Sequence, residues 1–472
     1  MELKKFKSTL SNLSYALLAQ SISLILSLIM SLIVPKLLNV EEYGYFQLFI
    51  FYSTYVGLFH FGMTDGIYLK YGGMRYQDLN KSLLGSQLWL MVLFQSVISL
   101  FIFLYAVNHV EDTKRIFVVF SLIVYIVVAN ITWFFGFIFQ AVNHTKWYSI
   151  SVIISKASYI FFIISLIFLK ESNYKIYIVL FIVAQGLAGL YCIFLGRDIA
   201  FAKLVSFKES LTAFFSNVKV GINLLFANVA SMMILGSGRI VVDYAWGVSA
   251  FGKFSFAISL SGFFLQFINQ LSMVLFPALR RADEGELKDF YKISRTALFI
   301  FLPFIYLVYT PIESILSLWL PQYKESLIYM ALLLPICTFD SKMNLLCITY
   351  FKVLRKEKVL LFVNILTMII SFLLSIISAF FIKNIYAVVI SMVIAIAFRS
   401  IISEIYLAKI MQEKIASSII QDLLLSLAFL YSTLQFDHFK GFTVFLVMYV
   451  IFVLFNWKKI SALFGKSPDF EA

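Results

Sequence analysis

Residues 13–34 read LSYALLAQSISLILSLIMSLIV, a run of 22 positions without a charged side chain. A helix of about 20 apolar residues crosses the hydrocarbon core of a bilayer, so this run alone predicts a transmembrane helix. Lys4, Lys5 and Lys7 precede the run, as in a signal peptide. Because no small-residue cleavage site follows it, we expect the helix to be retained.

The composition predicts an all-α integral membrane fold for the whole chain. Of 472 residues, 61% are hydrophobic and 13% are charged, and the mean hydropathy is +0.93. Ordinary soluble domains contain about 45–50% apolar and about 25% charged residues. The length criterion predicts about fourteen spans, although the last two are short and the twelfth follows its neighbour closely, so twelve or thirteen remain open. The predicted spans are 13–34, 45–67, 83–107, 116–140, 149–169, 176–196, 219–242, 253–277, 296–318, 326–349, 359–382, 386–408, 420–435 and 442–457.

The net charge of +13 arises mainly from short basic loops between the apolar runs. With the N-terminus inside, the cytoplasmic loops and termini together carry more than twice as many Lys and Arg residues as the external loops, which predicts that both termini are cytoplasmic. Such loops contact anionic membrane lipids, and we expect no nucleic-acid partner. The three cysteines and four histidines are scattered without metal-ligand spacing, so we expect no metal and no other cofactor.

A weak internal repeat suggests two lobes. Shifting the chain by 208 residues lays Leu17–Ser53 over Leu225–Ser261, and therefore the first span over the seventh. Six helices per repeat predict two lobes of the same orientation, related by an axis along the membrane normal, as in alternating-access transporters. The predicted parts are an N-terminal six-helix lobe over 1–215, a C-terminal six-helix lobe over 216–410, and two additional helices with a cytoplasmic tail over 411–472.

The loops are short. The longest, 197–218 and 278–295, are too small to fold as domains, although the second has the composition of a surface helix. Any function must therefore lie between the helices.

Four segments carry a family resemblance. PKLLNVEEYG at 35–44 resembles the signature of polysaccharide flippases of the Wzx type, which belong to the multidrug/oligosaccharidyl-lipid/polysaccharide (MOP) exporter superfamily. FGMTDG at 61–66 is similar to the next landmark of that family, and GVSAFGKFSFA at 247–257 with LFPALR at 275–280 repeats the pattern in the second half. Gly44 and Gly252 are expected to permit a tight re-entry into the membrane after an external loop.

The resemblance implies a transporter rather than an enzyme. Such proteins carry undecaprenyl-pyrophosphate-linked oligosaccharide units from the cytoplasmic to the periplasmic leaflet of a bacterial inner membrane, for O-antigen or capsule synthesis. Two lobes would rock about a cationic cavity, a polysaccharide polymerase is a candidate partner, and we expect a monomer. The sequence contains no nucleotide-binding motif, so energy would come from the membrane potential, an ion gradient or removal of the product.

Three rival functions stay open. A multidrug exporter or a peptidoglycan-precursor flippase would have the same fold. A membrane-embedded polysaccharide polymerase or ligase would handle the same lipid-linked glycans, but such enzymes typically carry a large periplasmic loop, and no predicted external loop here exceeds about a dozen residues.

Ionisable side chains inside spans are the candidate site residues, because each costs about 2.5–3.5 kcal/mol on insertion scales. A pyrophosphate group favours cations, and arginine can bind phosphate oxygens through two nitrogens. The candidate substrate-binding residues are Arg239, Lys156, Arg399 and Lys342. The candidate coupling or gating carboxylates are Asp340, Asp243 and Asp65.

Several of these residues have a structural alternative. Arg239 and Asp243 share a helix face at i and i+4 and alternatively form a stapled pair. Lys156 alternatively snorkels to the inner surface, and Asp65 alternatively caps a helix end.

Other candidates need partners on other helices. Asp340 and Lys342 are two positions apart and point away from each other, so Asp340 is either an ion-linked carboxylate or half of an interlobe salt bridge. Arg399 and Glu404, five apart, also need partners elsewhere. Pro335 is expected to kink the span next to this site.

Overall fold

The protein is all-helical. The computed structural model describes residues 2–279 and 283–465, which form helices and no strand. The first elements are α1 (Glu2–Leu32), α2 (Val34–Leu37), α3 (Val40–Ser53), η1 (Val56–His60), α4 (Met63–Tyr71), η2 (Tyr76–Asp78), α5 (Lys81–His109), α6 (Thr113–Ala141), α7 (Thr145–Leu169), α8 (Tyr174–Leu195), α9 (Arg197–Ala200) and α10 (Phe207–Leu279). The later elements are α11 (Glu284–Phe301), η3 (Leu302–Phe304), α12 (Ile305–Trp319), η4 (Pro321–Tyr323), α13 (Lys324–Lys342), η5 (Met343–Ile348), α14 (Thr349–Val353), α15 (Glu357–Ile376), η6 (Ile377–Ile382), α16 (Ile385–Met411), α17 (Ala416–Gln435), α18 (His438–Phe455) and α19 (Trp457–Gly465).

Twelve of the described helical stretches are long and apolar enough to cross a membrane. One of them, Phe207–Gln266, has 60 residues, or roughly 90 Å of helix, about three times the thickness of the hydrocarbon core. Gly247 interrupts it with φ 79° and ψ 179°, so this stretch supplies two crossings. The segment Val40–Tyr71, in which α3, η1 and α4 follow one another, supplies a further crossing. The chain is therefore a multi-pass membrane protein, and the predicted all-α fold of about fourteen helices is confirmed.

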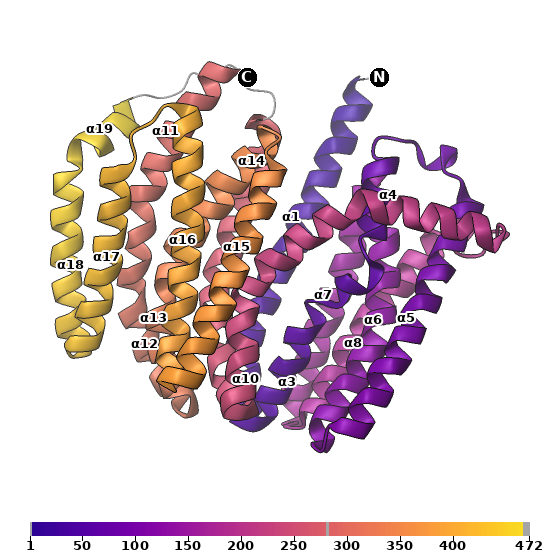
Figure 1. The fold of residues 1–472 in the computed structure, drawn as a ribbon, viewed down its shortest axis with the longest axis horizontal. Helices are drawn as coiled ribbons and strands as arrows, with labels where there is room; N and C mark the ends of the chain where they lie inside the picture. Colours follow the sequence, from indigo (N-terminus) through magenta and orange to yellow (C-terminus); the bar gives the residue numbers. More distant parts are fainter. Residues whose placement is uncertain (1, 280–282, 466–472) are drawn as a thin grey trace. The chain divides into compact units, whose positions relative to one another are not determined.

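The chain forms two compact units, Met1–Val229 and Ala230–Ala472. Within each unit the long helices run side by side (Figure 1). The boundary lies inside α10, beyond the predicted boundary after residue 215. α17 packs on α13 and α18 packs on α12, so the two additional helices are part of the second unit.

Side chains at the helix starts explain why many of these helices begin where they do. An Asn or Asp immediately before the first turn accepts hydrogen bonds from backbone N–H groups that have no partner within the helix. Residues with this role are Asn39, Asn80, Asp112, Asn173, Asp283 and Asn384.

Both halves change chain direction at the same point of the repeat. Asn39 has an extended backbone and caps α3, while Gly247, the equivalent position under the 208-residue shift, breaks α10 with a positive φ. This correspondence supports the repeat. The expectation for Gly44 and Gly252 is wrong, because both lie inside helices and neither has a positive φ. The cap of Asn39 and the backbone freedom of Gly247 make the two turns instead.

The second span differs from the continuous helix predicted over 45–67. Beyond α3, the chain forms the short 3₁₀ helix η1, and Phe61 and Gly62 then adopt left-handed conformations with φ of 52° and 78° before α4 begins. Glycine takes this conformation at little cost, whereas phenylalanine does not. The interruption is therefore maintained by contacts with its surroundings.

Polar side chains from neighbouring helices satisfy the backbone at this interruption. Asn130 Nδ2 on α6 donates a hydrogen bond to the Val56 carbonyl at 3.0 Å, and Gln95 Nε2 on α5 donates to the Phe59 carbonyl at 3.3 Å. At membrane depth no water is present to do this, so an irregular backbone is tolerated only where protein groups bind it.

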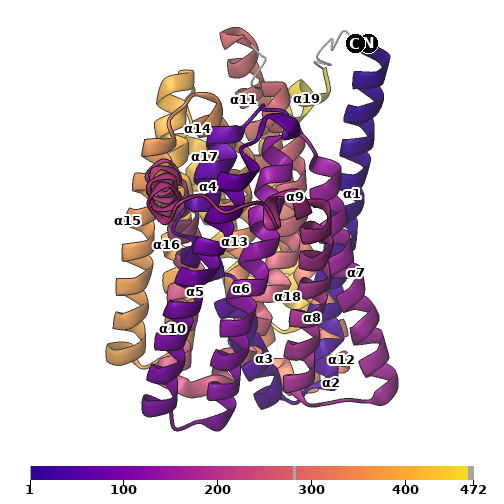
Figure 2. The same ribbon diagram turned by 90° about the vertical axis from the view of Figure 1, so that its right-hand side faces the viewer.

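The first part of α10 lies across the helices of the first unit and crosses α4 closely (Figures 1 and 2). A Cβ atom at Gly66 would overlap the backbone of Asn217, and one at Gly221 would overlap the Gly62 carbonyl. Asn217 Nδ2 also donates a hydrogen bond to Gln87 Oε1 on α5 at 2.7 Å. Small residues allow helix backbones to approach this closely inside membranes.

Both long predicted loops are partly helical. The segment 197–218 contains α9 and the start of α10. In 278–295, residues 280–282 lie outside the described residues, and α11 begins at Glu284 with a capping box formed by Asp283 and Glu286. The helix expected in this loop is present. It is not limited to the loop, because α11 continues to Phe301, inside the predicted span 296–318.

Gly66→Ala tests the close crossing of α4 and α10. We expect it to lower the free energy of unfolding by about 1–3 kcal/mol, because the added Cβ forces the two backbones apart. Thermal unfolding of the detergent-solubilised protein, followed by size-exclusion chromatography with fluorescence detection, measures the change. The control is Gly186→Ala in α8, where a Cβ meets no atom within 4 Å and alanine favours the helix by up to about 1 kcal/mol. Equal melting temperatures for the two variants would contradict the close crossing.

Candidate functional site

Six charged side chains gather inside the second unit and are called the buried charge cluster. They come from α11, α13, α16 and α17, and include three of the predicted site residues. The members are Arg295, Asp340, Lys342, Arg399, Glu404 and Asp422.

Arg399 and Asp340 form one pair of the cluster. Arg399 on α16 is only 3% exposed, and its Nη1 lies 3.4 Å from Asp340 Oδ1 on α13. Arg399 Nη2 donates a hydrogen bond to Ser231 Oγ on α10 at 3.1 Å, and Asn344 Nδ2 donates to Asp340 Oδ2 at 3.0 Å. These partners of Asp340 both belong to the second unit, so Asp340 pairs within its own unit.

The α13 segment that carries Asp340 is irregular on its C-terminal side. α13 continues through Pro335 to Lys342, and the π-helix η5 follows directly. The irregularity expected at Pro335 therefore lies several residues later, beside the charged side chains. Single π-turns inside α-helices occur frequently at functional sites.

Lys342 forms the most deeply buried pair. Its ammonium donates a hydrogen bond to Asp422 on α17, and both side chains are 2% exposed. The ammonium also lies 5.7 Å from the ring centre of Phe299, whose ring is 5.0 Å from the Lys459 ammonium. As predicted, Lys342 does not pair with Asp340 two residues before it.

Arg295 and Glu404 form the third pair. Arg295 Nη2 on α11 lies 3.6 Å from Glu404 Oε2 on α16, and Arg295 Nη1 donates a hydrogen bond to Ser418 Oγ on α17 at 3.4 Å. Glu404 therefore pairs with a different helix and not with Arg399 on its own helix, in agreement with their spacing.

The cluster is balanced in charge, with three cations and three carboxylates. Buried charges are tolerated when they are paired, because the desolvation of each ion is several kcal/mol. An anion that enters the cluster can replace a carboxylate as the partner of a cation, and a proton that binds a carboxylate can release its cation. In the described parts of the chain, His, Cys, Asp and Glu side chains form no group of three that would hold a metal ion.

Arg239 and Asp243 lie on α10, on one face of the helix. Arg239 Nη2 donates a hydrogen bond to Ser255 Oγ at 3.0 Å, and its guanidinium carbon lies 5.2 Å from the ring centre of Phe251. Ser231, the Arg399 partner, is eight residues before Arg239, or roughly 12 Å along the helix. Arg239 is therefore not part of the buried charge cluster.

The first unit contains the two remaining predicted residues, on different helices. Lys156 on α7 is half-buried, with its ammonium 6.0 Å from the ring centre of Phe181. Asp65 lies in the first turn of α4, at the interruption of the second span and not at its inner end, and its carboxylate is 3.9 Å from His60 Nε2. His60 Nδ1 accepts a hydrogen bond from the Gly62 N–H at 3.0 Å. A negative charge in the first turn of a helix is favourable, although the N-cap residue of α4 is Gly62 and no side-chain hydrogen bond caps this helix.

Four residues at these sites were not among the predicted site residues: Arg295, Glu404, Asp422 and His60. Arg295 ends a predicted loop and Asp422 is near the start of a predicted span, and charges are ordinary at such positions. Glu404 and Asp422 carried a usable signal, since both are acidic residues inside predicted spans.

The sequence profile of one family, described as "Polysaccharide biosynthesis protein", matches residues 9–283. That match covers more than half of the chain. A search of curated proteins finds no match.

Several solved structures share the fold. One described as "Lipid II flippase MurJ, inward closed conformation" has a TM-score of 0.64 at 14% identity and covers 95% of this chain and 99% of that one. An inward-facing multidrug resistance MATE family transporter of the MOP superfamily has a TM-score of 0.59 at 12% identity, with 85% and 98% covered. A MOP superfamily transporter from Pyrococcus furiosus has a TM-score of 0.55 at 10% identity, with 86% and 96% covered. These likenesses show a fold of the MOP transporter type.

Removing one member of the Lys342–Asp422 pair should destabilise the protein strongly. We expect Lys342→Met or Asp422→Leu alone to lower the free energy of unfolding by about 3–5 kcal/mol, because each leaves one buried charge without a partner. The double variant should come within about 1 kcal/mol of the wild type, since replacing both charges removes the desolvation cost as well. Melting temperatures in detergent measure these differences.

The exposed pair Lys253–Glu325, with a 2.7 Å contact, is the matched control. Lys253→Met and Glu325→Leu should each change stability by about 1 kcal/mol or less. A double Lys342/Asp422 variant as unstable as the worse single variant would show that the pair contributes through packing and not through charge compensation.

Proposed function

The chain belongs to the family of polysaccharide biosynthesis proteins, and from this we propose that it is a flippase for lipid-linked oligosaccharides. It carries undecaprenyl-pyrophosphate-linked units from the cytoplasmic to the periplasmic leaflet of a bacterial inner membrane, for the synthesis of O-antigen or capsule. The MOP-type fold supports a transporter, and the solved flippase of the same fold supports a lipid-linked substrate.

The observation that carries the proposal is the environment of Lys156. Its ammonium lies against the Phe181 ring, and no carboxylate pairs with it among residues 2–279 and 283–465. A cation inside a membrane span costs about 2.5–3.5 kcal/mol on insertion scales when it is not neutralised. A pyrophosphate headgroup would supply the missing negative charge. Before it binds, a cation–π contact with the aromatic ring stabilises the ammonium.

The other candidate cations have different proposed roles. Lys342 and Arg399 are each paired with a carboxylate, so a phosphate would have to displace Asp422 or Asp340 before it could bind there. We assign Asp340 to coupling on this ground, because breaking its pair with Arg399 would alter the charge inside the second unit. Arg239, with its guanidinium on the Phe251 ring, remains a proposed headgroup ligand.

The movement we propose is alternating access between two units related by the repeat. The equivalent breaks at Asn39 and Gly247 support two halves of the same orientation. A parallel repeat of this kind is typical of transporters that expose one site to each side in turn.

The test compares the leaflet distribution of lipid-linked units in a bacterium that makes a surface polysaccharide from them. Deleting the gene should cause the units to accumulate on the cytoplasmic side, and wild-type protein should relieve this. Lys156→Gln should reduce translocation by about tenfold or more at equal expression, because an ionic contact with phosphate is lost, and Lys156→Arg should restore most of it. Arg239→Ala, examined in the same strain, tests the second proposed ligand.

Lys175→Gln is the matched control. The Lys175 ammonium lies 5.3 Å from the ring centre of Phe117, but the residue is exposed at the start of α8, so its loss should leave translocation unchanged. If single units reach the periplasm normally without the protein and are never joined, the polymerase or ligase alternative is correct. If lipid-linked glycan is unaffected but drug resistance or peptidoglycan precursors change, one of the other two alternatives is correct.

A further inference from the structure

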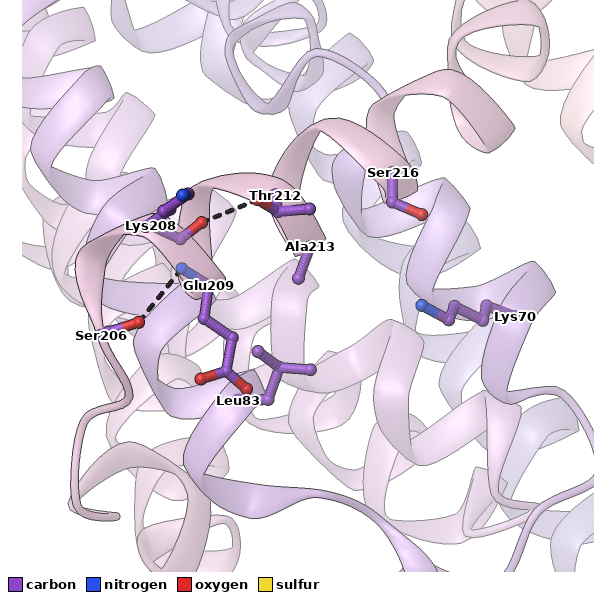
Figure 3. A pocket seen from close by; sticks show the side chains of 8 residues that line it. All are labelled: Lys70, Leu83, Ser206, Lys208, Glu209, Thr212, Ala213 and Ser216. Atoms are coloured by element: carbon purple, nitrogen blue, oxygen red, sulfur yellow. Dashed lines mark hydrogen bonds between the residues drawn. The ribbon is translucent and has the colours of Figure 1, made fainter.

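The first unit contains a pocket of about 540 Å³ that is lined by none of the charged residues discussed above. It lies between the end of α4, the start of α5 and the start of α10 (Figure 3). This volume falls within the range of about 300–1,000 Å³ that is typical of small-molecule sites. The loops nearest to it, at 72–80 and 201–206, are on the face predicted to be cytoplasmic.

Charges of both signs line this pocket. Lys70 reaches toward it from α4, while Glu209 and Lys208 are on the first turn of α10 (Figure 3). In the described part of the chain, neither Lys70 nor Glu209 makes an ion pair within 4.0 Å. The hydroxyl-bearing residues Ser206, Thr212 and Ser216 complete the polar lining. A ligand that satisfies these walls carries a negative group and a positive, hydrogen-bond-donating group a few ångströms apart.

The surroundings of the pocket are those of a membrane surface. Phe207 and Phe215 on α10 and Leu69 on α4 are 64%, 58% and 51% exposed, directly next to the charged side chains. The first part of α10 lies across the other helices of the unit, as an interfacial helix does. Exposed aromatic and aliphatic groups beside lysines fit the boundary between headgroups and acyl chains. The ligand is therefore an amphiphile and not a soluble metabolite.

We propose that this pocket binds the headgroup of a phospholipid that carries both a phosphate and a primary amine, as phosphatidylethanolamine does. Lys70 binds the phosphate, and Glu209 on the opposite wall binds the ammonium. The acyl chains lie along the exposed apolar side chains of α4 and α10. This inference is independent of the transported substrate, because the pocket shares no residue with the proposed transport site.

The test measures lipid binding to the delipidated full-length protein in detergent by native mass spectrometry. The probes are dioctanoyl-phosphatidylethanolamine, dioctanoyl-phosphatidylglycerol and farnesyl pyrophosphate. We expect the wild type to bind the ethanolamine lipid more tightly than either anionic probe. Lys70→Gln and Glu209→Gln should each weaken that binding about three- to fivefold, the range expected for partly exposed charge contacts. Glu209→Gln should also shift the preference toward phosphatidylglycerol, because it removes the carboxylate that repels an anionic headgroup.

Lys219→Gln, an exposed lysine further along α10 that does not line the pocket, is the control and should bind like the wild type. The proposal fails if the Lys70 and Glu209 variants bind the ethanolamine lipid as well as the control does. It also fails if the wild type prefers phosphatidylglycerol, which would make the pocket a site for anionic phospholipids. A preference for farnesyl pyrophosphate would overturn it too, and would identify the pocket as an entry site for the polyprenyl-linked substrate.

Discussion

A polar group placed in hydrocarbon must find its partner within the protein, and both units of this molecule depend on that requirement. In the first unit, the interruption of the second span is possible because Asn130 and Gln95 bind the exposed carbonyl groups. In the second unit, the cations of α11, α13 and α16 each contact a carboxylate from another helix. The polar side chains thus add specific contacts between helices to the packing of the buried apolar side chains.

Hydropathy predicted most of the fold, because the thickness of the bilayer fixes the length of a span. The interruption in the second span escaped prediction since Asn130 is 74 residues away from the carbonyl that it binds. The site was predicted less completely than the fold. The helical period showed that Asp340 and Lys342 do not pair, yet it could not identify Arg399 and Asp422 as their partners. Those contacts arise from helix packing, which no local pattern in the sequence encodes.

The charged residues of the two units differ in their degree of compensation. The buried charge cluster of the second unit is balanced, and its pairs connect different helices. Lys156 in the first unit has an aromatic ring as its contact and no carboxylate within the described ranges. Charges that are paired with opposite charges stabilise one arrangement of the helices. A cation without a carboxylate partner instead favours the binding of an anion. This contrast separates residues that stabilise the protein from those proposed to act on the substrate.

The pairing of Lys342 with Asp422 also has a consequence for biosynthesis. The two residues are 80 positions apart, and ribosomes add roughly 5–20 residues per second. Lys342 is therefore added to the chain roughly 4 to 16 seconds before its counter-ion Asp422 is added. During that interval the nascent α13 has to remain near the insertion machinery or bind a temporary partner there, because a lone ammonium is unfavourable in lipid. The second unit reaches its final helix arrangement only after α17, close to the end of the chain, has been made.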